Sequence, residues 1–280
     1  SEAVAALFLD AEGDGDQDLY VVNGGSWEEE DLTAYQDRLY INEGFGRFVG
    51  SDLLPPMPAS GGTVAAHDFD GDADLDLFVG GRVSPGRYPE APRSYVLENV
   101  GGRFEDVTPE SLMHPGMVSS ALWADLDSNS EGVELLLAGE WMPLRLFSFE
   151  DGGWRERTRS AGFDQTSGWW NTVRAVDLDR DGALDLVAGN RGLNHGLQAD
   201  PTRPAALFYG DFGRDGTVDP ILTYVADGRR YPVAWRDELL DQIPRLRRNF
   251  PDYRSYAEAS IDEILTEEQR EAAGRLDAVD

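Results

Sequence analysis

The feature that most constrains this chain is an acidic loop that returns five times between two apolar runs. The fullest copy begins at Asp68, ends at Leu77 and carries Asp at its first, third, fifth, seventh and ninth positions. The other copies begin at Asp10, Asp125, Asp177 and Asp211. Each loop leads into a strand-like run, so the pattern indicates a repeated β-structure.

The spacing of the loops predicts the size of the repeat. Their first residues are 10, 68, 125, 177 and 211, which gives intervals of 58, 57, 52 and 34 residues. In the second repeat we expect strands at 62–69, 75–82, 94–99 and 103–107, and four short strands per repeat are typical of a β-propeller blade. The same order is expected at 4–9, 18–23, 38–42 and 46–49, and again at 119–124, 133–139, 144–149 and 154–157. The short fourth repeat leaves room for two strands and an irregular connection at 190–204.

The acidic side chains of one loop would converge if the backbone wrapped round a point. Four carboxylates about 4 Å apart form six pairs, and their repulsion is on the order of 20 kcal/mol at an effective dielectric of 20. A bound cation would remove this repulsion. Several hard oxygen ligands suit Ca²⁺ better than Mg²⁺, which keeps its waters and requires stricter geometry. Transition metals are disfavoured because the chain has no Cys and only three His. The alternative is a set of ordinary acidic turns, but five copies in one register favour the metal.

The predicted ligands are the side chains at positions one, three, five and nine, with a backbone carbonyl from position seven. We expect loops two and four to be the strongest sites, and loop five to be weak or empty because Gly213 stands at its third position. Loop three has one extra residue before its last acid. The candidates are Asp10, Glu12, Asp14, Asp16 and Asp18 in loop one; Asp68, Asp70, Asp72, Asp74 and Asp76 in loop two; Asp125, Asp127, Asn129 and Glu134 in loop three; Asp177, Asp179, Asp181, Ala183 and Asp185 in loop four; and Asp211, Asp215, Thr217 and Asp219 in loop five.

An EF-hand begins with similar spacing but needs Glu at the twelfth position and helices on both sides. Here the twelfth positions are apolar and lie in β-rich runs: Val21, Val79, Leu136 and Ala188. We therefore expect each loop to join two strands.

These loops, with the segments 138–143 (AGEWMP) and 167–171 (SGWWN), resemble FG-GAP/VCBS repeat proteins. That group includes the integrin α-subunit propeller and secreted proteins similar to cartilage acidic protein. The likeness runs from residue 4 to about residue 232. It implies an all-β, calcium-bearing β-propeller, usually of seven blades, displayed outside the cytoplasm. This sequence supplies about four to five blades, which leaves closure of the ring open.

The composition changes after residue 232, so we predict propeller blades over 1–232 and a helical segment over 233–280. Ser260 with Glu263, and Thr266 with Gln269, have capping-box spacing. Pro244 and Pro251 predict several short helices in place of one long helix. We also expect the chain to be part of a longer protein.

The net charge of −29 is carried by 53 acidic residues against 24 basic residues, all of which are Arg. Such a surface disfavours nucleic acid and anionic membranes, and it resembles the composition of salt-adapted proteins. No apolar run reaches the roughly 18 residues of a membrane span, so direct membrane insertion is not expected. Sites of this type often bind Ca²⁺ in the high-micromolar to millimolar range. That range favours a location outside the cell or in the cell envelope, in the periplasm or on the outer surface.

Three Trp residues invite two interpretations. Trp141, Trp169 and Trp170 would form a platform for sugars if they were exposed, or pack between blades if they were buried. We expect packing.

The other polar candidates carry little chemistry. The three His residues lie outside any catalytic motif, and the Arg cluster after Pro244 could grip an acidic partner or pair with neighbouring acids, which we favour. These residues are His67, His114, His195, Arg245, Arg247 and Arg248.

Two functions are consistent with these patterns. The first is a calcium-binding propeller module without catalytic activity, which recognises a protein or a glycan. The alternative is an extracellular carbohydrate-active enzyme on the same scaffold, with paired acids in the central funnel that are distinct from the loop ligands.

Overall fold

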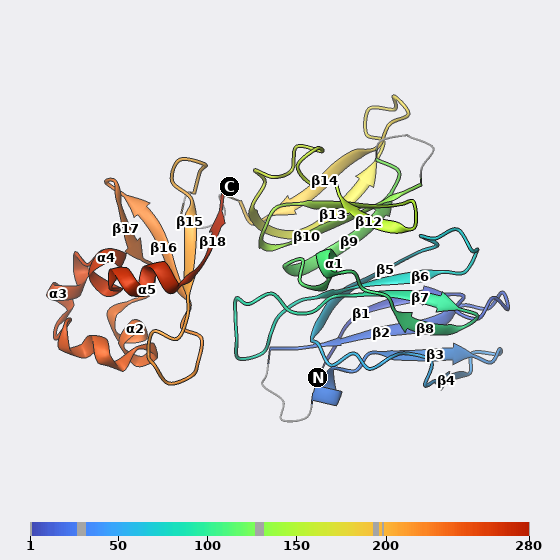
Figure 1. The fold of residues 1–280 in the computed structure, drawn as a ribbon, viewed down its shortest axis with the longest axis horizontal. Helices are drawn as coiled ribbons and strands as arrows, with labels where there is room; N and C mark the ends of the chain where they lie inside the picture. The colour runs from blue at the N-terminus through green and yellow to red at the C-terminus, as the bar shows by residue number, and fades with distance from the viewer. Residues whose placement is uncertain (1, 27–31, 127–131, 193–195, 198, 280) are drawn as a thin grey trace.

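The computed structural model describes residues 2–26, 32–126, 132–192, 196–197 and 199–279. The described chain is an all-β protein of four antiparallel sheets with four to six strands each, accompanied by a few short helices (Figure 1). The sheets of the first two repeats and the sheet shared by the third and fourth repeats lie against one another. The fourth sheet belongs to a separate C-terminal unit.

The first repeat forms one four-stranded sheet in chain order. Its strands are β1 (Glu2–Leu9), β2 (Asp18–Gly24), β3 (Arg38–Asn42) and β4 (Phe48–Gly50), and the 3-10 helix η1 (Leu32–Tyr35) precedes β3. Acidic loop one connects β1 to β2, as expected.

The second repeat forms a second sheet of the same order. Its strands are β5 (Gly61–His67), β6 (Asp76–Gly81), β7 (Tyr95–Val100) and β8 (Arg103–Asp106), followed by the one-turn helix α1 (Glu110–Met113). All six residues of β6 are buried, because this strand has neighbours on both edges and sheets on both faces.

The third and fourth repeats share a six-stranded sheet. The third repeat supplies β9 (Met117–Ala124), β10 (Glu134–Met142), β11 (Arg145–Glu150) and β12 (Gly153–Glu156). The fourth supplies β13 (Gly168–Val176) and β14 (Asp185–Asn190), and β13 pairs with the far end of β10 across a bulge. These bounds confirm the predicted strands of the first three repeats, with shifts of up to three residues at their ends, and the two strands expected in the fourth.

Burial at one repeated position shows how the sheets stack. Tyr20, Phe78 and Leu136 follow their loops at the same position in β2, β6 and β10, and each is fully buried in an apolar cluster. The equivalent residue of β14, Val187, is 47% exposed. The first three repeats are therefore each covered by the next, and the described residues do not form a closed ring.

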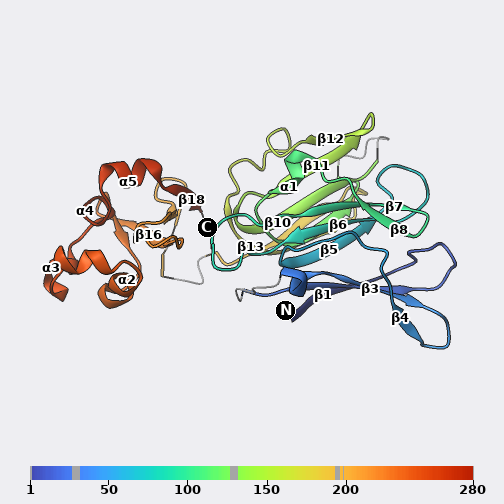
Figure 2. The same ribbon diagram turned by 60° about the horizontal axis from the view of Figure 1, so that its bottom comes forward.

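The C-terminal unit contains strands β15 (Ala205–Tyr209), β16 (Ile221–Ala226), β17 (Arg229–Pro232) and β18 (Gly274–Ala278), in the order β17-β16-β15-β18. Figures 1 and 2 both show it beside the stacked sheets, at the end away from the loops of the first two repeats. Between β17 and β18 the chain forms α2 (Arg236–Gln242), η2 (Pro244–Arg248), α3 (Tyr253–Ala257), α4 (Ile261–Ile264) and α5 (Glu267–Ala272).

The helical prediction for the C-terminal segment rests on its caps and prolines, and the structure shows both. The backbone N–H of Ser260 donates to Glu263 at 2.8 Å, and Thr266 accepts from the N–H of Gln269 at 3.3 Å. The segment ends differently from the expectation, because residues 274–278 form β18. The open edge of β15 accepts this strand, and the boundary placed at residue 232 falls between β17 and α2, inside one apolar cluster.

Candidate metal loops

The first Asp of each loop organises the turn by accepting backbone N–H groups. In loop two, Asp68 Oδ1 accepts from Gly71 at 2.7 Å and from Asp72 at 3.2 Å, and its Oδ2 accepts from Ala73 at 3.0 Å. Asp10, Asp177 and Asp211 likewise accept from the fifth and sixth residues of their loops. One carboxylate thus satisfies several N–H groups that the turn leaves outside any ladder.

Two left-handed residues make this convergence possible. The fourth and sixth residues have positive φ in loops one, two, four and five; they are Gly13, Gly15, Gly71, Ala73, Arg180, Gly182, Arg214 and Gly216. Five of the eight are Gly, which adopts this conformation without the steric cost that Ala or Arg meets.

The last acid is buried in loops one, two, three and five and half-buried in loop four, where it is Asp185. Asp76 is 0% exposed; its Oδ2 accepts from the N–H of Phe69 at 3.1 Å and its Oδ1 from the N–H of Asn99 in β7 at 2.8 Å. In loop one Asp18 accepts in the same way from the backbone N–H groups of Ala11 and of Asn42 in β3. The ninth Asp therefore fixes the turn onto the third strand of its sheet.

Loop three keeps this contact despite its extra residue. Glu134 is 5% exposed and its Oε2 accepts from the N–H of Leu126 at 2.8 Å, the bond that Asp76 makes with Phe69 in loop two. The longer Glu side chain spans the extra residue. Asp125 precedes Leu126, whereas the predicted ligands Asp127 and Asn129 lie outside the described residues.

Burial and neighbouring charges raise the pKa values of several loop acids. Burial raises the pKa of Asp76 to about 6, although the N–H donors of Asn99 and Phe69 lower it, and Asp70 and Asp72 add to the increase. The pKa of Asp219 is raised mainly by burial and partly by other loop acids. Proximity of like charges makes a bound cation favourable at these loops.

The structure brings the acids together most closely in loops two and four. In loop two, ligand oxygens of Asp68, Asp70 and Asp76 all lie within 4.8 Å of one another, and in loop four the same holds for Asp177, Asp179 and Asp181. Two Ca²⁺–oxygen bonds of about 2.3–2.6 Å allow their oxygens to be up to about 5 Å apart. Both groups therefore fit ligands of a single calcium ion, and these are the loops that the sequence favoured.

The remaining predicted ligands are placed in the loops but form no such group among the described residues. In loop two the carboxylate of Asp72 accepts from the backbone N–H of Asp74. Asp14 in loop one and Asp181 in loop four each accept in the same way from the N–H two residues later. In loop four Asp185 accepts from the N–H of Leu178 at 2.9 Å, the bond that Asp76 makes with Phe69 in loop two. The pKa of Glu12 is raised by slight burial and by Asp18, Asp14 and Asp10, so loop one also gathers negative charge.

Loop five has the turn without the acid cluster. Asp219 Oδ2 accepts from the N–H of Gly213 at 2.6 Å, and Asp215 accepts from both the N–H and the hydroxyl of Thr217. Gly213 supplies no oxygen where the other loops carry an acid, which is the physical reason for the difference.

The Trp residues pack as predicted. Trp141 and Trp169 are 6% and 7% exposed, and their rings meet edge to face with centroids 4.7 Å apart. Trp170 packs against a cluster of β10 and β14, and its Nε1 donates to the carbonyl of Thr166 at 2.8 Å.

The His and Arg candidates have structural surroundings. The ring of His67 lies 5.3 Å from that of Trp123, and burial lowers the pKa of this His. His114 Nδ1 lies 3.2 Å from the carbonyl oxygen of Pro92, and His195 lies outside the described residues. Arg247 pairs with Asp241 at 2.7 Å, which confirms for this residue the predicted pairing with a neighbouring acid.

One buried acid, Asp37, is not among the residues that the sequence patterns single out. Asp37 accepts from the hydroxyl of Tyr20 at 2.8 Å and from the N–H of Asn23 at 2.7 Å, and burial raises its pKa to about 7. It stands outside the repeated loops, so no pattern distinguishes it from a surface acid. Its contacts join the start of β3 to β2 and give it a structural role.

Comparison with known families gives one finding. Residues 10–79 match the model of the FG-GAP-like repeat family. The match spans acidic loops one and two and confirms the resemblance to FG-GAP/VCBS repeats over those residues. A comparison with curated proteins finds no match.

Proposed function

We propose that this protein is a calcium-binding recognition module without catalytic activity, which acts outside the cell or in the cell envelope. The observation that supports it best is the pair of three-carboxylate groups in loops two and four. Calcium would be held by these acids and would cancel their repulsion, so the loop and the strands fixed to it would become more rigid. The FG-GAP-like repeat at residues 10–79 supports a role in recognition.

The proposed location has separate support. None of the helices in the described ranges has the length and apolar character needed to cross a membrane. FG-GAP repeats are common outside the cell, where calcium reaches the millimolar range that loops of this kind require. The partner would be a protein or a glycan; the net charge of −29 disfavours nucleic acid.

Calcium binding can be tested by titration calorimetry together with thermal unfolding in Ca²⁺ and in EDTA. At a free calcium concentration 100 times Kd, the free energy of unfolding should rise by about 2.7 kcal/mol per site. Asp70→Ala and Asp179→Ala should each remove one binding event. Asp52→Ala, which removes an exposed acid outside the loops, is the matched control. Unfolding that is identical in Ca²⁺ and EDTA would rule the proposal out.

The alternative, a carbohydrate-active enzyme, requires paired acids apart from the loop ligands. Glycoside hydrolysis generally uses two carboxylates flanking the bond that breaks. A cleft of about 780 Å³ has Glu140 as the one acid among its described lining residues. No observation therefore favours the enzyme over the recognition module.

A further inference from the structure

A cleft of about 780 Å³ lies between the stacked sheets and the C-terminal unit. Figures 1 and 2 show the two bodies side by side at this end of the stack, opposite the loops of the first two repeats. Aromatic side chains line both walls. The blade side supplies Tyr88, Trp141 and Trp169, and the C-terminal unit supplies Tyr224, Tyr231 and Trp235.

The blade wall is held rigidly. Trp141 Nε1 donates to the hydroxyl of Tyr88 at 2.8 Å, and the edge-to-face contact with Trp169 fixes the other side of the indole. Trp141 has a φ of 58°, a left-handed conformation that a large side chain rarely adopts. Backbone strain of this kind is concentrated at ligand-binding positions, where surrounding contacts hold it in place.

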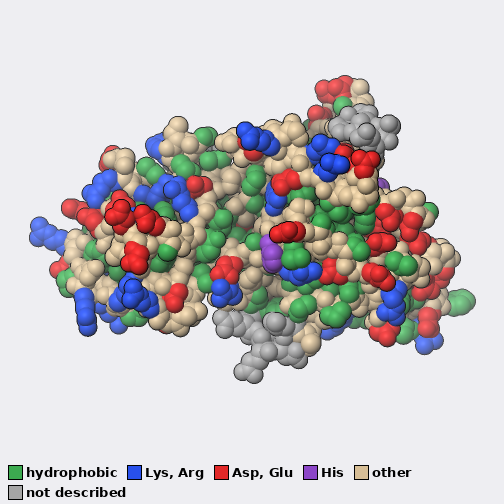
Figure 3. All heavy atoms as spheres, in the orientation of Figure 1, with side chains coloured by type: hydrophobic (Ala, Val, Ile, Leu, Met, Phe, Trp, Pro, Cys, Tyr) green, Lys and Arg blue, Asp and Glu red, His purple; other side chains and the backbone are tan. Residues whose placement is uncertain are grey.

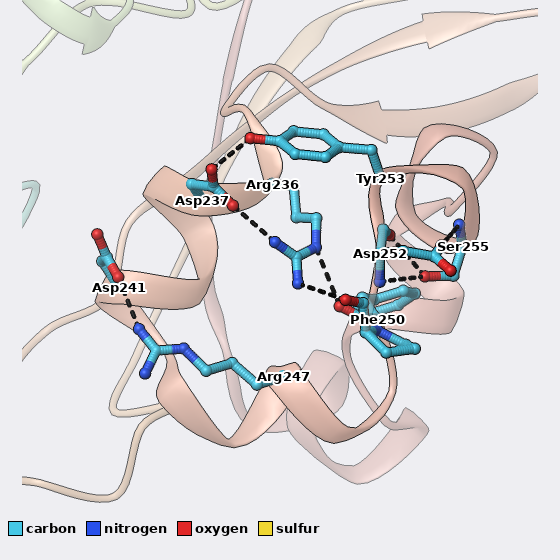
Figure 4. A network of polar contacts seen from close by, with 9 residues as sticks. Arg236, Asp237, Asp241, Arg247, Phe250, Asp252, Tyr253 and Ser255 are labelled. Atoms are coloured by element: carbon cyan, nitrogen blue, oxygen red, sulfur yellow. Dashed lines mark hydrogen bonds and ion pairs between the residues drawn. The ribbon is translucent and has the colours of Figure 1, made fainter.

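The rim of the opposite wall is fixed by the network of Figure 4. Arg236 donates to the carbonyl oxygens of Phe250 and Pro251, both at 3.0 Å, and to Asp237 Oδ1 at 2.6 Å. The hydroxyl of Tyr253 donates to the same carboxylate. The Tyr253 ring is thus oriented although the residue is 60% exposed.

Trp235 precedes this network and is 75% exposed, the largest exposed fraction among the described Trp residues. An indole left in water forgoes the favourable burial of a large apolar surface. An exposed Trp beside a preformed cleft is typical of a recognition surface.

Two polar groups inside the cleft have hydrogen-bonding capacity left over. Glu140 uses Oε1 to accept from Arg82 at 2.7 Å, and its Oε2 has no hydrogen bond within the described ranges. The guanidinium of Arg191 has no hydrogen bond or ion pair with any described residue. An acceptor and a set of donors therefore stand beside flat aromatic surfaces.

The geometry points to an oligosaccharide as the ligand of this cleft, an inference that rests on the proposed recognition function and names its partner class. The exposed aromatic residues of the cleft are Trp235, Tyr253 and Tyr88, and the C–H faces of sugar rings pack on such planes, whereas Trp141 and Trp169 are buried and support the wall. Neighbouring hydroxyls both donate to a carboxylate and accept from a guanidinium. Arg82 already balances Glu140, so the cleft carries no excess negative charge despite the acidic surface elsewhere (Figure 3). A hydroxyl-rich chain supplies both the donors that Glu140 can accept and the acceptors that Arg191 needs.

The test is titration of the intact, calcium-loaded chain with cellohexaose, mannohexaose and chitohexaose, followed by Trp fluorescence and calorimetry. We expect at least one of them to bind, and Trp235→Ala to weaken that binding about tenfold or more. Arg191→Gln and Glu140→Gln should each weaken it several-fold. Phe45→Ala, which changes a fully exposed aromatic in the turn between β3 and β4, is the matched control.

Three outcomes would overturn the inference: no binding of any of the three sugars, sugar binding that is unchanged in Trp235→Ala, or Trp235-dependent binding of a proline-rich peptide in place of sugars. Circular dichroism of each variant checks that it is folded. If only the sugar inference is wrong, the protein still binds calcium in the calorimeter. If the proposed function is wrong, calcium titration in the same calorimeter gives no binding heat.

Discussion

Loops two and five have the same backbone turn but differ in their acid clusters. In both, the first Asp accepts N–H groups from the fifth and sixth residues, and the fourth and sixth residues have positive φ. In both, the ninth Asp is almost fully buried. Three carboxylates come within 4.8 Å of one another in loop two, and no such group forms in the described loop five.

The comparison separates two roles of the acidic residues. The first and ninth Asp hold the turn through backbone hydrogen bonds, and these bonds form with or without a complete acid set. At the third position loop two has Asp70, whose carboxylate belongs to the cluster, whereas loop five has Gly213, which offers no side-chain oxygen. The turn can therefore form without the acid cluster.

The largest effect is expected from removing the ninth Asp in either loop. Asp76→Ala leaves the N–H groups of Phe69 and Asn99 without their acceptor, at a cost of about 3 kcal/mol in the free energy of unfolding. Asp219→Ala should cost about 2–3 kcal/mol for the same reason. Urea denaturation in EDTA measures both, with Asp52→Ala as control. A much smaller loss of unfolding free energy in Asp219→Ala than in Asp76→Ala would show that the ninth Asp does not hold both turns in the same way.

A smaller effect is expected from pH. Without calcium, the folded protein holds a proton on Asp76 up to a pKa of about 6, whereas an unfolded Asp releases it near its ordinary value of 3.8. The folded state binds more protons in this window, so this residue makes stability fall as pH rises from about 4 to about 6. With saturating calcium the dependence should reverse, because binding needs the ionised carboxylates.

Denaturation at about pH 4 and about pH 6 measures this dependence, and Asp76→Asn should reduce it. A calcium-free protein that becomes more stable over this range, with no change in Asp76→Asn, would contradict the assignment.

Loop five can be used to test what the third position supplies. In Gly213→Asp the added Cβ would lie 3.3 Å from Asp219 Oδ2 and 3.5 Å from Asp215 Oδ2, so a carboxylate would join the other two. We expect a loss of about 1 kcal/mol without calcium, from like-charge repulsion, and one additional binding event with calcium. Gly213→Asn, which adds an oxygen without the charge, is the control. If calorimetry finds the same stoichiometry in Gly213→Asp and the unchanged protein, the third position does not decide binding.

The smallest effect is expected at Ala73, the sixth residue of loop two, which has a φ of 80° where the other described loops place Gly. Ala73→Gly should stabilise the calcium-free protein by up to about 1 kcal/mol, because Gly avoids the left-handed steric cost. Gly71→Ala is the reciprocal variant and should destabilise by a similar amount. Opposite signs would show that the turn is not under this strain.

Most of the strands and the strongest candidate sites could be predicted from local sequence. The acidic loops, the apolar runs after them and the caps at Ser260 and Thr266 are short-range patterns, and physics acts on them within a few residues. Gly at the fourth and sixth loop positions also carried a signal for left-handed residues. Asp37 carried none, because its burial depends on Tyr20 and Asn23, which are distant in sequence.

Local sequence patterns are thus enough to predict the repeat, the turn of each loop and the residues that offer oxygen ligands. Three features depend on long-range packing: which carboxylates meet, the pairing of residues 274–278 with β15, and the aromatic residues from two bodies that face one cleft. The physical reason is range: a turn is fixed by hydrogen bonds between neighbours, whereas burial, charge concentration and clefts depend on surfaces that come together only when the chain is packed.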